Sequence, residues 1–130
     1  MIDCENEVFT RVKTAITTIY PNAYVTSEYV RSPARFPHIS IVMSDNRVDD
    51  RHTINSEMSN VAFTIDIYSN KQNGKKSECK QIVSIIDDTL FAMNFIREAY
   101  ATVPNLENTS IYRLTVRYIG QTNGIYFFRR

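Results

Sequence analysis

The stretch VAFTIDIYSNKQNGKKSECKQIVSIIDDTLFAM, residues 61–93, carries the clearest structural signals in the chain. Apolar residues occupy every second position from Val61 to Ile67, which is the period of a strand with one apolar face. From Cys79 to Met93 the apolar residues recur every three or four positions, which is the period of an amphipathic helix. The stretch therefore predicts a strand, a turn at Asn73–Gly74, and a helix from about Lys75 to Met93.

A strand, a Gly-Lys turn and a helix in succession also outline a phosphate-binding loop. That loop requires the pattern Gly-x-x-x-x-Gly-Lys-Ser/Thr. Counted from Gly74, Ser69 stands at the first glycine position and Lys76 at the hydroxyl position. The missing glycine would wrap the phosphate and the missing hydroxyl would bind magnesium, so nucleotide hydrolysis is disfavoured. The turn is interpreted as a helix start, with a weak anion site at Lys75 and Lys76 as the alternative.

The flanking sequence supplies a second helix and more strands. A helix is predicted from about Asp3 to Tyr20, ended by Pro21. Its apolar face consists of Val8, Val12, Ala15, Ile16 and Ile19. Strands are predicted at 23–30, 38–44, 61–69, 111–120 and 125–130, the last two joined through an Asn123–Gly124 hairpin turn. The polar segment Asp45–Asn60 is predicted to be a long exposed loop, and residues 94–110 a connector.

The element order is thus α-β-β-β-α-β-β, over a length of 130 residues that fits one domain, residues 1–130. Successive strands favour antiparallel pairing, and two helices can cover one face of a sheet. The predicted fold class is α/β of the α+β type. Its sheet is mostly antiparallel or mixed and is flanked by two main helices.

Composition narrows the possible functions. Lys and Arg number 15 against 14 Asp and Glu, a net charge of +1, which argues against a surface dedicated to sequence-specific nucleic acid. No apolar run is long enough to cross a membrane, and the polar start does not resemble a signal peptide. The two Cys and two His residues lack metal-ligand spacing, and no nucleophile motif is present. We therefore expect no enzyme, no cofactor and no metal.

Several polar residues suggest contacts between proteins. Asp66 lies within a strand and is expected to pair with an arginine across the sheet, either Arg113 or Arg117. The loop Asp45–Asn60 is expected to be exposed, and such loops often order on binding. Aromatic residues in IYFFRR, 125–130, point to both faces of a strand, so one face needs a partner or is covered by the domain itself.

The layout resembles the tail terminator, or tail-completion, proteins of long-tailed bacteriophages. The resemblance covers about residues 3–120. It rests on FTIDIYSN followed by GKKSECKQI, and on the late pattern formed by Arg113, Arg117 and Tyr118. The family implies a structural virion-assembly protein that forms hexameric rings in the tail, at the head–tail junction. Such a ring caps the tail tube, stops its polymerisation, and offers a surface to head-completion proteins.

Exposure, rather than any family motif, suggests the residues that make these contacts. The predicted tube-contact residues in the loop are Arg47, Asp49, Asp50, Arg51 and His52. The residues predicted for the ring interface or the lumen are Asp66, Arg113 and Arg117. A head-closure or neck protein of the same particle is the main alternative. An enzyme that holds a phosphorylated ligand through Lys75 and Lys76, and a nucleic-acid binder, are weaker alternatives.

Overall fold

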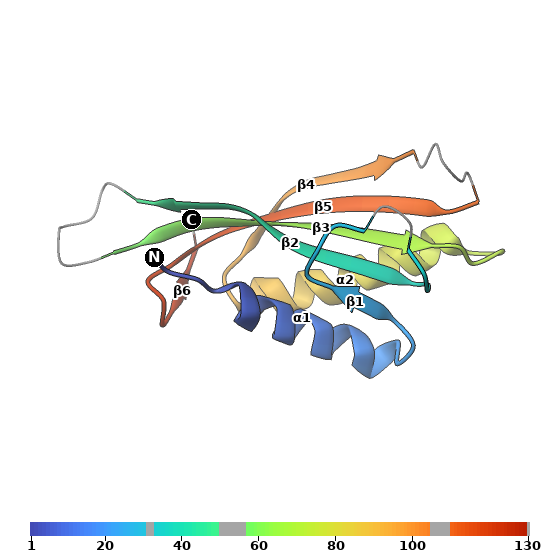
Figure 1. The fold of residues 1–130 in the computed structure, drawn as a ribbon, viewed down its shortest axis with the longest axis horizontal. Helices are drawn as coiled ribbons and strands as arrows, with labels where there is room; N and C mark the ends of the chain where they lie inside the picture. The colour runs from blue at the N-terminus through green and yellow to red at the C-terminus, as the bar shows by residue number, and fades with distance from the viewer. Residues whose placement is uncertain (31–32, 50–56, 105–109, 130) are drawn as a thin grey trace.

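The computed structural model describes residues 1–30, 33–49, 57–104 and 110–129. Within them, two helices lie on one face of a six-stranded sheet (Figure 1). The elements are α1 (Glu5–Ile19), β1 (Tyr24–Thr26), β2 (His38–Val48), β3 (Ser59–Ser69), α2 (Lys75–Ala92), β4 (Ile96–Val103), β5 (Tyr112–Thr122) and β6 (Phe127–Phe128).

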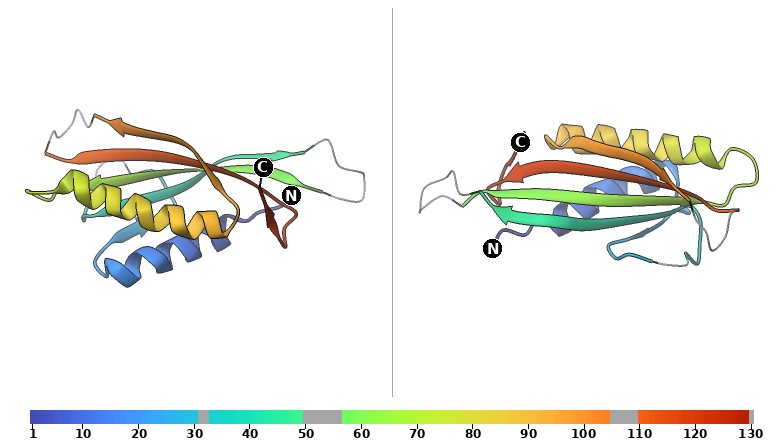
Figure 2. Two further views of the ribbon diagram at one scale, coloured as in Figure 1. Left: turned by 180° about the vertical axis from the view of Figure 1, so that it is seen from behind. Right: turned by 90° about the horizontal axis from the view of Figure 1, so that it is seen from above.

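The sheet has the strand order β1-β2-β3-β5-β4, and β6 pairs with the end of β5. The β1–β2 pair is parallel and every other pair is antiparallel. Figure 2 shows both helices packed on the same side, with the opposite face of the sheet turned away from them. The predicted class, a mixed sheet flanked by two helices, is confirmed.

The core lies between the helices and the sheet. The α1 stripe is buried only at Val8, Val12 and Ile16. The apolar stripe predicted between Cys79 and Met93 is buried at all six of its positions, Cys79, Ile82, Val83, Ile86, Leu90 and Met93. Ile19, at the last turn of α1, is 61% exposed. The strands contribute Phe63, Ile65, Ile67, Leu114, Val116 and Tyr118 from the helix-facing side. The alternation along Val61–Ile67 therefore located the core face of β3.

The turn at the end of α2 directs the chain into β4. Asn94 has a φ of 67°, and the Phe95 N–H donates a 2.9 Å hydrogen bond to the Leu90 carbonyl. A left-handed residue after the last helical turn is a common helix end, and Asn tolerates it. The Asn94 side chain also donates to the Phe127 carbonyl at 2.8 Å. This turn fixes Phe95 in the core, where its side chain is 1% exposed.

Two predicted loops are strands. β2 continues to Val48 and β3 begins at Ser59, so the prediction of a loop over the whole of Asp45–Asn60 is wrong. The prediction of residues 94–110 as a connector is also wrong, because β4 occupies Ile96–Val103. The described residues of both segments lack a buried apolar face, and a strand without one shows no hydrophobic alternation. Cross-strand pairing, which the sequence pattern does not reveal, forms them.

The long β2–β3 hairpin projects beyond the helices (Figure 1). We refer to Asp45–Asp49 and Met58–Ala62 as the arm. The register between β2 and β3 shifts between Met43 and Asp45, where a β-bulge marks the start of the arm. Beyond this bulge the sheet has no helix against it in the views of Figures 1 and 2. The arm is therefore held by strand pairing rather than by a helix layer.

Candidate protein-interaction surface

The face of the sheet turned away from the helices, here called the outer face, carries a row of polar side chains on three strands. The register sets Asp66 opposite both Ser40 and Thr115, and Tyr68 opposite both His38 and Arg113. His38, Ser40, Asp66 and Tyr68 are buried, although no helix covers them.

Asp66 is the centre of this row. Its carboxylate oxygen Oδ1 accepts hydrogen bonds from Arg113 Nε at 3.2 Å and Nη2 at 3.1 Å, and a short one from Thr115 Oγ1. The predicted pairing of Asp66 with an arginine is confirmed, with Arg113 as the partner. Burial lowers the pKa of the Arg113 guanidinium, but Asp66 outweighs it and the net pKa is raised.

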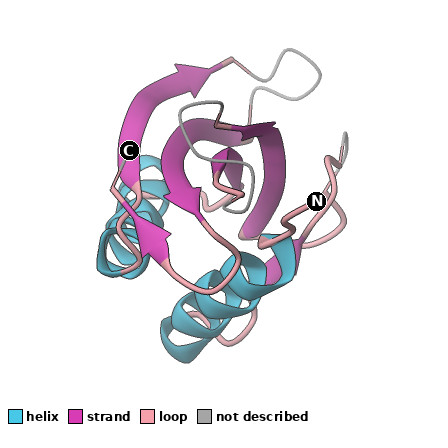
Figure 3. Ribbon diagram, turned by 90° about the vertical axis from the view of Figure 1, so that its left-hand side faces the viewer, coloured by secondary structure: helices cyan, strands magenta, loops and turns pink. Residues whose placement is uncertain are grey.

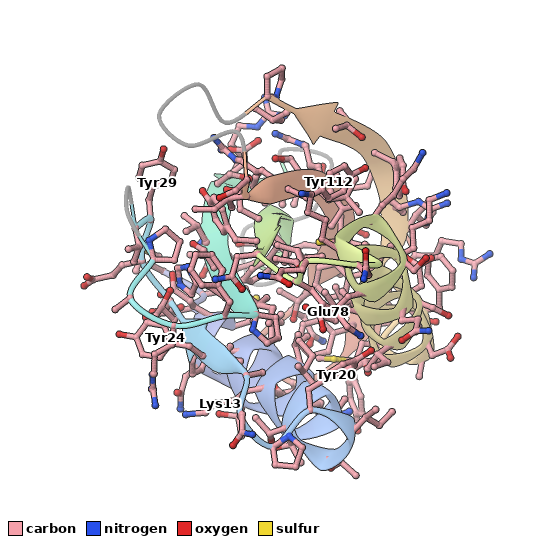
Figure 4. The ribbon with its side chains drawn as sticks, turned by 90° about the vertical axis from the view of Figure 1, so that its right-hand side faces the viewer. Lys13, Tyr20, Tyr24, Tyr29, Glu78 and Tyr112 are labelled. Carbon is pink, nitrogen blue, oxygen red and sulfur yellow. The ribbon has the colours of Figure 1, made fainter. Side chains whose placement is uncertain are left out.

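Two tyrosines lie beside the Arg113 guanidinium. The rings of Tyr29 and Tyr68 have their centroids 5.8 and 5.5 Å from it, within the range of a cation–π contact. Burial, reinforced by the Asp66 charge, raises the pKa of Tyr68 to about 12. Tyr29 lies on the segment between β1 and β2, which crosses this end of the molecule (Figure 4). The Glu28 carbonyl on the same segment accepts a 2.8 Å hydrogen bond from Ser40, so the segment contacts this end of the outer face.

Arg117 is separate from this cluster. Its Nε lies 3.0 Å from Oε1 of Glu98 on β4, without hydrogen-bond geometry, and both side chains are partly exposed. Of the three residues predicted for a ring interface or lumen, the structure thus joins Asp66 and Arg113 and leaves Arg117 nearer the β4 edge. Their role in assembly stays a prediction.

The residues predicted to contact the tube differ in exposure. Arg47 is exposed on the arm and forms a 3.2 Å ion pair with Asp45. Asp49 is buried, and Gln121 Nε2 donates to its Oδ2 at 2.7 Å, so the exposure assumed for Asp49 is wrong. The same nitrogen donates to Asn60 Oδ1 at 3.0 Å, which fastens the arm to β5. Asp50, Arg51 and His52 lie outside the described residues.

Exposed apolar side chains gather at the arm end of the molecule. Val48 is 64% exposed on the arm, and Ile125 and Tyr126 are 74% and 64% exposed in the turn between β5 and β6. The β5–β6 turn lies next to the N-terminal segment, since a Cβ atom added at Gly124 would stand 3.8 Å from Cγ2 of Ile2. Figure 3, which looks onto this end, shows β6 and the N-terminus there. Because exposed apolar side chains can take part in interaction sites, this end of the molecule is a candidate contact surface.

The C-terminal hairpin follows the prediction only in part. The Asn123 side-chain oxygen accepts from the N–H groups of Ile125 and Tyr126, and Gly124 has a φ of 95°, so the predicted turn is confirmed. The return strand comprises only Phe127–Phe128 rather than 125–130. Phe127 packs on Phe95, with ring centroids 5.6 Å apart, while Tyr126 remains outside.

The turn before α2 does not resemble a phosphate cradle. Ser69 donates a 2.8 Å hydrogen bond to Glu78 Oε1, which places a carboxylate in the first turn of α2. A carboxylate there takes the place that a phosphate would need and repels it. A surface cavity of about 740 Å³ beside α1 is lined by Lys13 and Arg35, but not by Lys75 or Lys76. The alternative of an anion site at Lys75 and Lys76 gains no support from this geometry.

The adjacent acidic residues Asp87 and Asp88 late in α2 predict a solvated face, and Asp88 is exposed as predicted, whereas the Asp87 side chain is only 17% exposed. Its carboxylate accepts a hydrogen bond from Arg97 Nη1 at 2.7 Å and another from the buried Tyr118 hydroxyl. Burial and this hydrogen bond raise the pKa of Tyr118. Asp87 therefore ties α2 to β4 and β5.

Cys4 and Cys79 are free and buried, and burial raises the pKa of their thiols to about 11 and 12.

The fold and these surfaces can be compared with known proteins. A solved chain from the "Virion of native gene transfer agent (GTA) particle" has a similar fold, with a TM-score of 0.59 and 11% sequence identity over 86% of this chain and 88% of that chain. No curated protein sequence matches. The model of the family "Tail completion protein gp17" matches residues 6–122. The chain belongs to this family.

Membership in the tail completion family confirms the resemblance found in the sequence and makes the chain a structural protein of the bacteriophage tail. The match runs from α1 to the end of β5, so β6 lies outside it. Among the described residues, no helix is both long and apolar enough to span a membrane.

His38 makes the outer face sensitive to pH. Its Nε2 lies 3.0 Å from Thr26 Oγ1, while its buried Nδ1 has no hydrogen-bond partner among the described residues. Burial lowers the His38 pKa from 6.5, and the Asp66 charge offsets this only in part. The unfolded chain therefore binds the proton more readily, so stability is complete above about pH 6.5 and falls as the pH decreases towards the folded pKa.

We expect His38→Gln to flatten the decline in unfolding free energy between pH 7.5 and pH 5. One proton limits the difference in slope to about 1.4 kcal/mol per pH unit. Urea titrations of both chains across this range measure it. His52 is present in both chains and cancels. Equal slopes for the two chains would mean that His38 does not control the acid response.

Proposed function

We propose that residues 1–130 form one domain that caps the tail tube, stops its polymerisation and provides the surface on which the head docks. In this proposal the chain acts as a ring, with the six copies that the family resemblance implies, at the head–tail junction of the virion. Its partners are further copies of itself, the tail tube protein and a head-completion protein. Membership in the tail completion family supports this role.

The observation that carries the tube-capping proposal is the exposed apolar end formed by the arm and the β5–β6 turn. Val48, Ile125 and Tyr126 are all more than 60% exposed at this end, and the arm extends past the helix layer. An interface core is enriched in such apolar and aromatic groups, with charged groups at its rim. The ion pair between the exposed Arg47 and the partly exposed Asp45 supplies a charged rim near Val48. We therefore propose that this end contacts the tube.

Val48→Glu is expected to weaken capping at least tenfold, because the new charge has to be desolvated in the interface, which costs about 1.4 kcal/mol or more. Ile19→Glu is the matched control, since Ile19 is 61% exposed on α1, away from the arm. The measurement is the fraction of capped ends on tubes polymerised from the accompanying tail tube protein, counted by negative-stain microscopy against protein concentration. Equal capping by the two variants would remove the arm from the interface.

The same preparation tests the neck-protein alternative. A head-closure protein would bind the portal complex and leave tube ends open. A tail-capping protein would bind tube ends and fix their length. Binding to the portal complex alone would therefore overturn the capping proposal.

A further inference from the structure

The sheet has two edges without a strand partner in the described part of the chain. β4 pairs with β5 on one side only and is the last strand of the sheet. On the other side of the sheet, β1 pairs with β2 only along His38–Ser40, which leaves the outer edge of Ile41–Val48 unpaired among the described strands. An unpaired edge presents backbone N–H and C=O groups that can pair with another strand.

β4 lacks the usual protection of a free edge. Six of its eight residues are exposed, so it is accessible from both faces as well as along its edge. Proteins blunt such edges with charged residues, proline or bulges. Here Arg97, Glu98 and a bulge occur only at the start of the strand, while Ala99–Val103 contains no charged residue and no proline. Tyr100, in the middle of this segment, is 44% exposed.

The two free edges match in length and direction. β2 has eleven residues, of which three pair with β1, so eight remain free, and β4 also has eight. β2, β3, β5 and β4 are successively antiparallel, so β4 runs opposite to β2. A second copy in the same orientation would therefore place its β2 beside β4 as an antiparallel partner, with its helices on the same face of the joined sheet.

We propose that the free edge of β4 in one copy pairs with the Ile41–Val48 edge of β2 in the next copy. The contact joins two different surfaces, so it repeats from copy to copy and can close into a ring. The edge pairing follows from the strand geometry, and its use in a tail ring rests on the proposed capping function. The rival arrangement is a twofold dimer in which β4 pairs with β4.

Cross-linking between introduced cysteines separates the two arrangements. One chain carries Ala101→Cys on β4, and a second chain of different mass carries Ser44→Cys at an exposed position of β2. The native Cys4 and Cys79 are buried and react slowly. A short bis-maleimide linker tolerates small shifts in register. We expect cross-linked pairs only when the two chains are mixed. They are expected both in concentrated solutions of the protein without tubes and in protein bound to tube ends.

Proline variants test the backbone pairing itself. Along a strand, neighbouring backbone N–H groups point to opposite sides. One of the two variants Tyr100→Pro and Ala101→Pro therefore removes a hydrogen bond to β5. The other removes only an N–H group on the free edge of β4. The variant that keeps the wild-type melting temperature has lost only the free N–H group. Its self-association constant, measured by native mass spectrometry, is expected to be at least tenfold weaker than that of the wild type. Wild-type self-association by that variant would overturn the proposed pairing.

The remaining outcomes distinguish the pairing from the capping role. Cross-linking of the Ala101→Cys chain with itself would replace the proposal by the twofold dimer. Capped tubes without mixed cross-links would overturn the β4–β2 contact and leave the capping function standing. Mixed cross-links with uncapped tubes would support the contact and overturn the capping function. Monomers that neither cross-link nor cap would overturn both.

Discussion

Arg113→Ala is expected to lower the free energy of unfolding by about 3 kcal/mol, because it leaves a buried carboxylate without its cation. The Asp66 side chain is 7% exposed, and among the described residues the Thr115 hydroxyl would be the one side-chain donor left to its carboxylate after the substitution. The change also removes the cation between the rings of Tyr29 and Tyr68. Equilibrium unfolding in urea, monitored by circular dichroism, measures the loss.

Arg117→Ala is the matched control on the same strand and face. Its ion pair with Glu98 is partly exposed, at 34% and 47% of the two side chains, and such pairs contribute less than about 1 kcal/mol. A double-mutant cycle with Asp66→Ala and Arg113→Ala measures the coupling energy between these two side chains. The double variant is the informative member, because it removes both charges and leaves no unpaired charge behind. Equal losses for Arg113→Ala and Arg117→Ala would show that the Asp66 cluster does not stabilise the fold.

Gly120→Ala is expected to cost about 2 kcal/mol, within the usual range for overpacking a core. A Cβ atom at this position of β5 would stand 2.8 and 2.9 Å from two ring carbons of Phe95. The ring cannot easily move away, because it is 1% exposed and lies between the rings of Phe63 and Phe127. The measurement is the urea unfolding curve of the variant against the wild type.

The Phe95→Ala chain supplies the control for this clash. With the ring removed, adding a methyl group at Gly120 is expected to be nearly neutral or to fill part of the cavity. A penalty of the same size in the Phe95→Ala chain would place the cost in the backbone of β5 rather than in contact with the ring.

The sequence predicted those parts of the fold that have one buried face. The alternation along Val61–Ile67 and the α2 stripe located the core because each has an apolar and a polar side. β4 and the arm segments Asp45–Asp49 and Met58–Asn60 were missed because they bury no apolar side chain: the residues buried there, Asp49 and Ser59, are polar. Pairing with β5 and with the neighbouring strand of the hairpin forms them. A pattern of single residues does not record which strand lies alongside.

The candidate surface was predicted unevenly for a related reason. The Asp66–Arg113 pair was found because a charged residue inside a strand needs a partner across the sheet. The burial of Asp49 was missed because it depends on Gln121, which lies seventy-two positions later. The Asp87 contacts with Tyr118 and Arg97 were missed because they join a helix to two strands. Only the three-dimensional arrangement brings these partners together.

The arm has a consequence for how related chains can diverge. The described part of the arm pairs β2 with β3 beyond the helix layer and ends at a 2.7 Å hydrogen bond from the Asp49 N–H to the Met58 carbonyl. Doubling the length of such a connection costs only about 0.6 kcal/mol in closure entropy. Two residues added to each strand would extend its reach by about 7 Å, at 3.4 Å per residue, and leave every core contact in place. If the arm contacts the tail tube as proposed, such insertions would fit it to tubes of different diameter while the helix-covered part of the domain is kept.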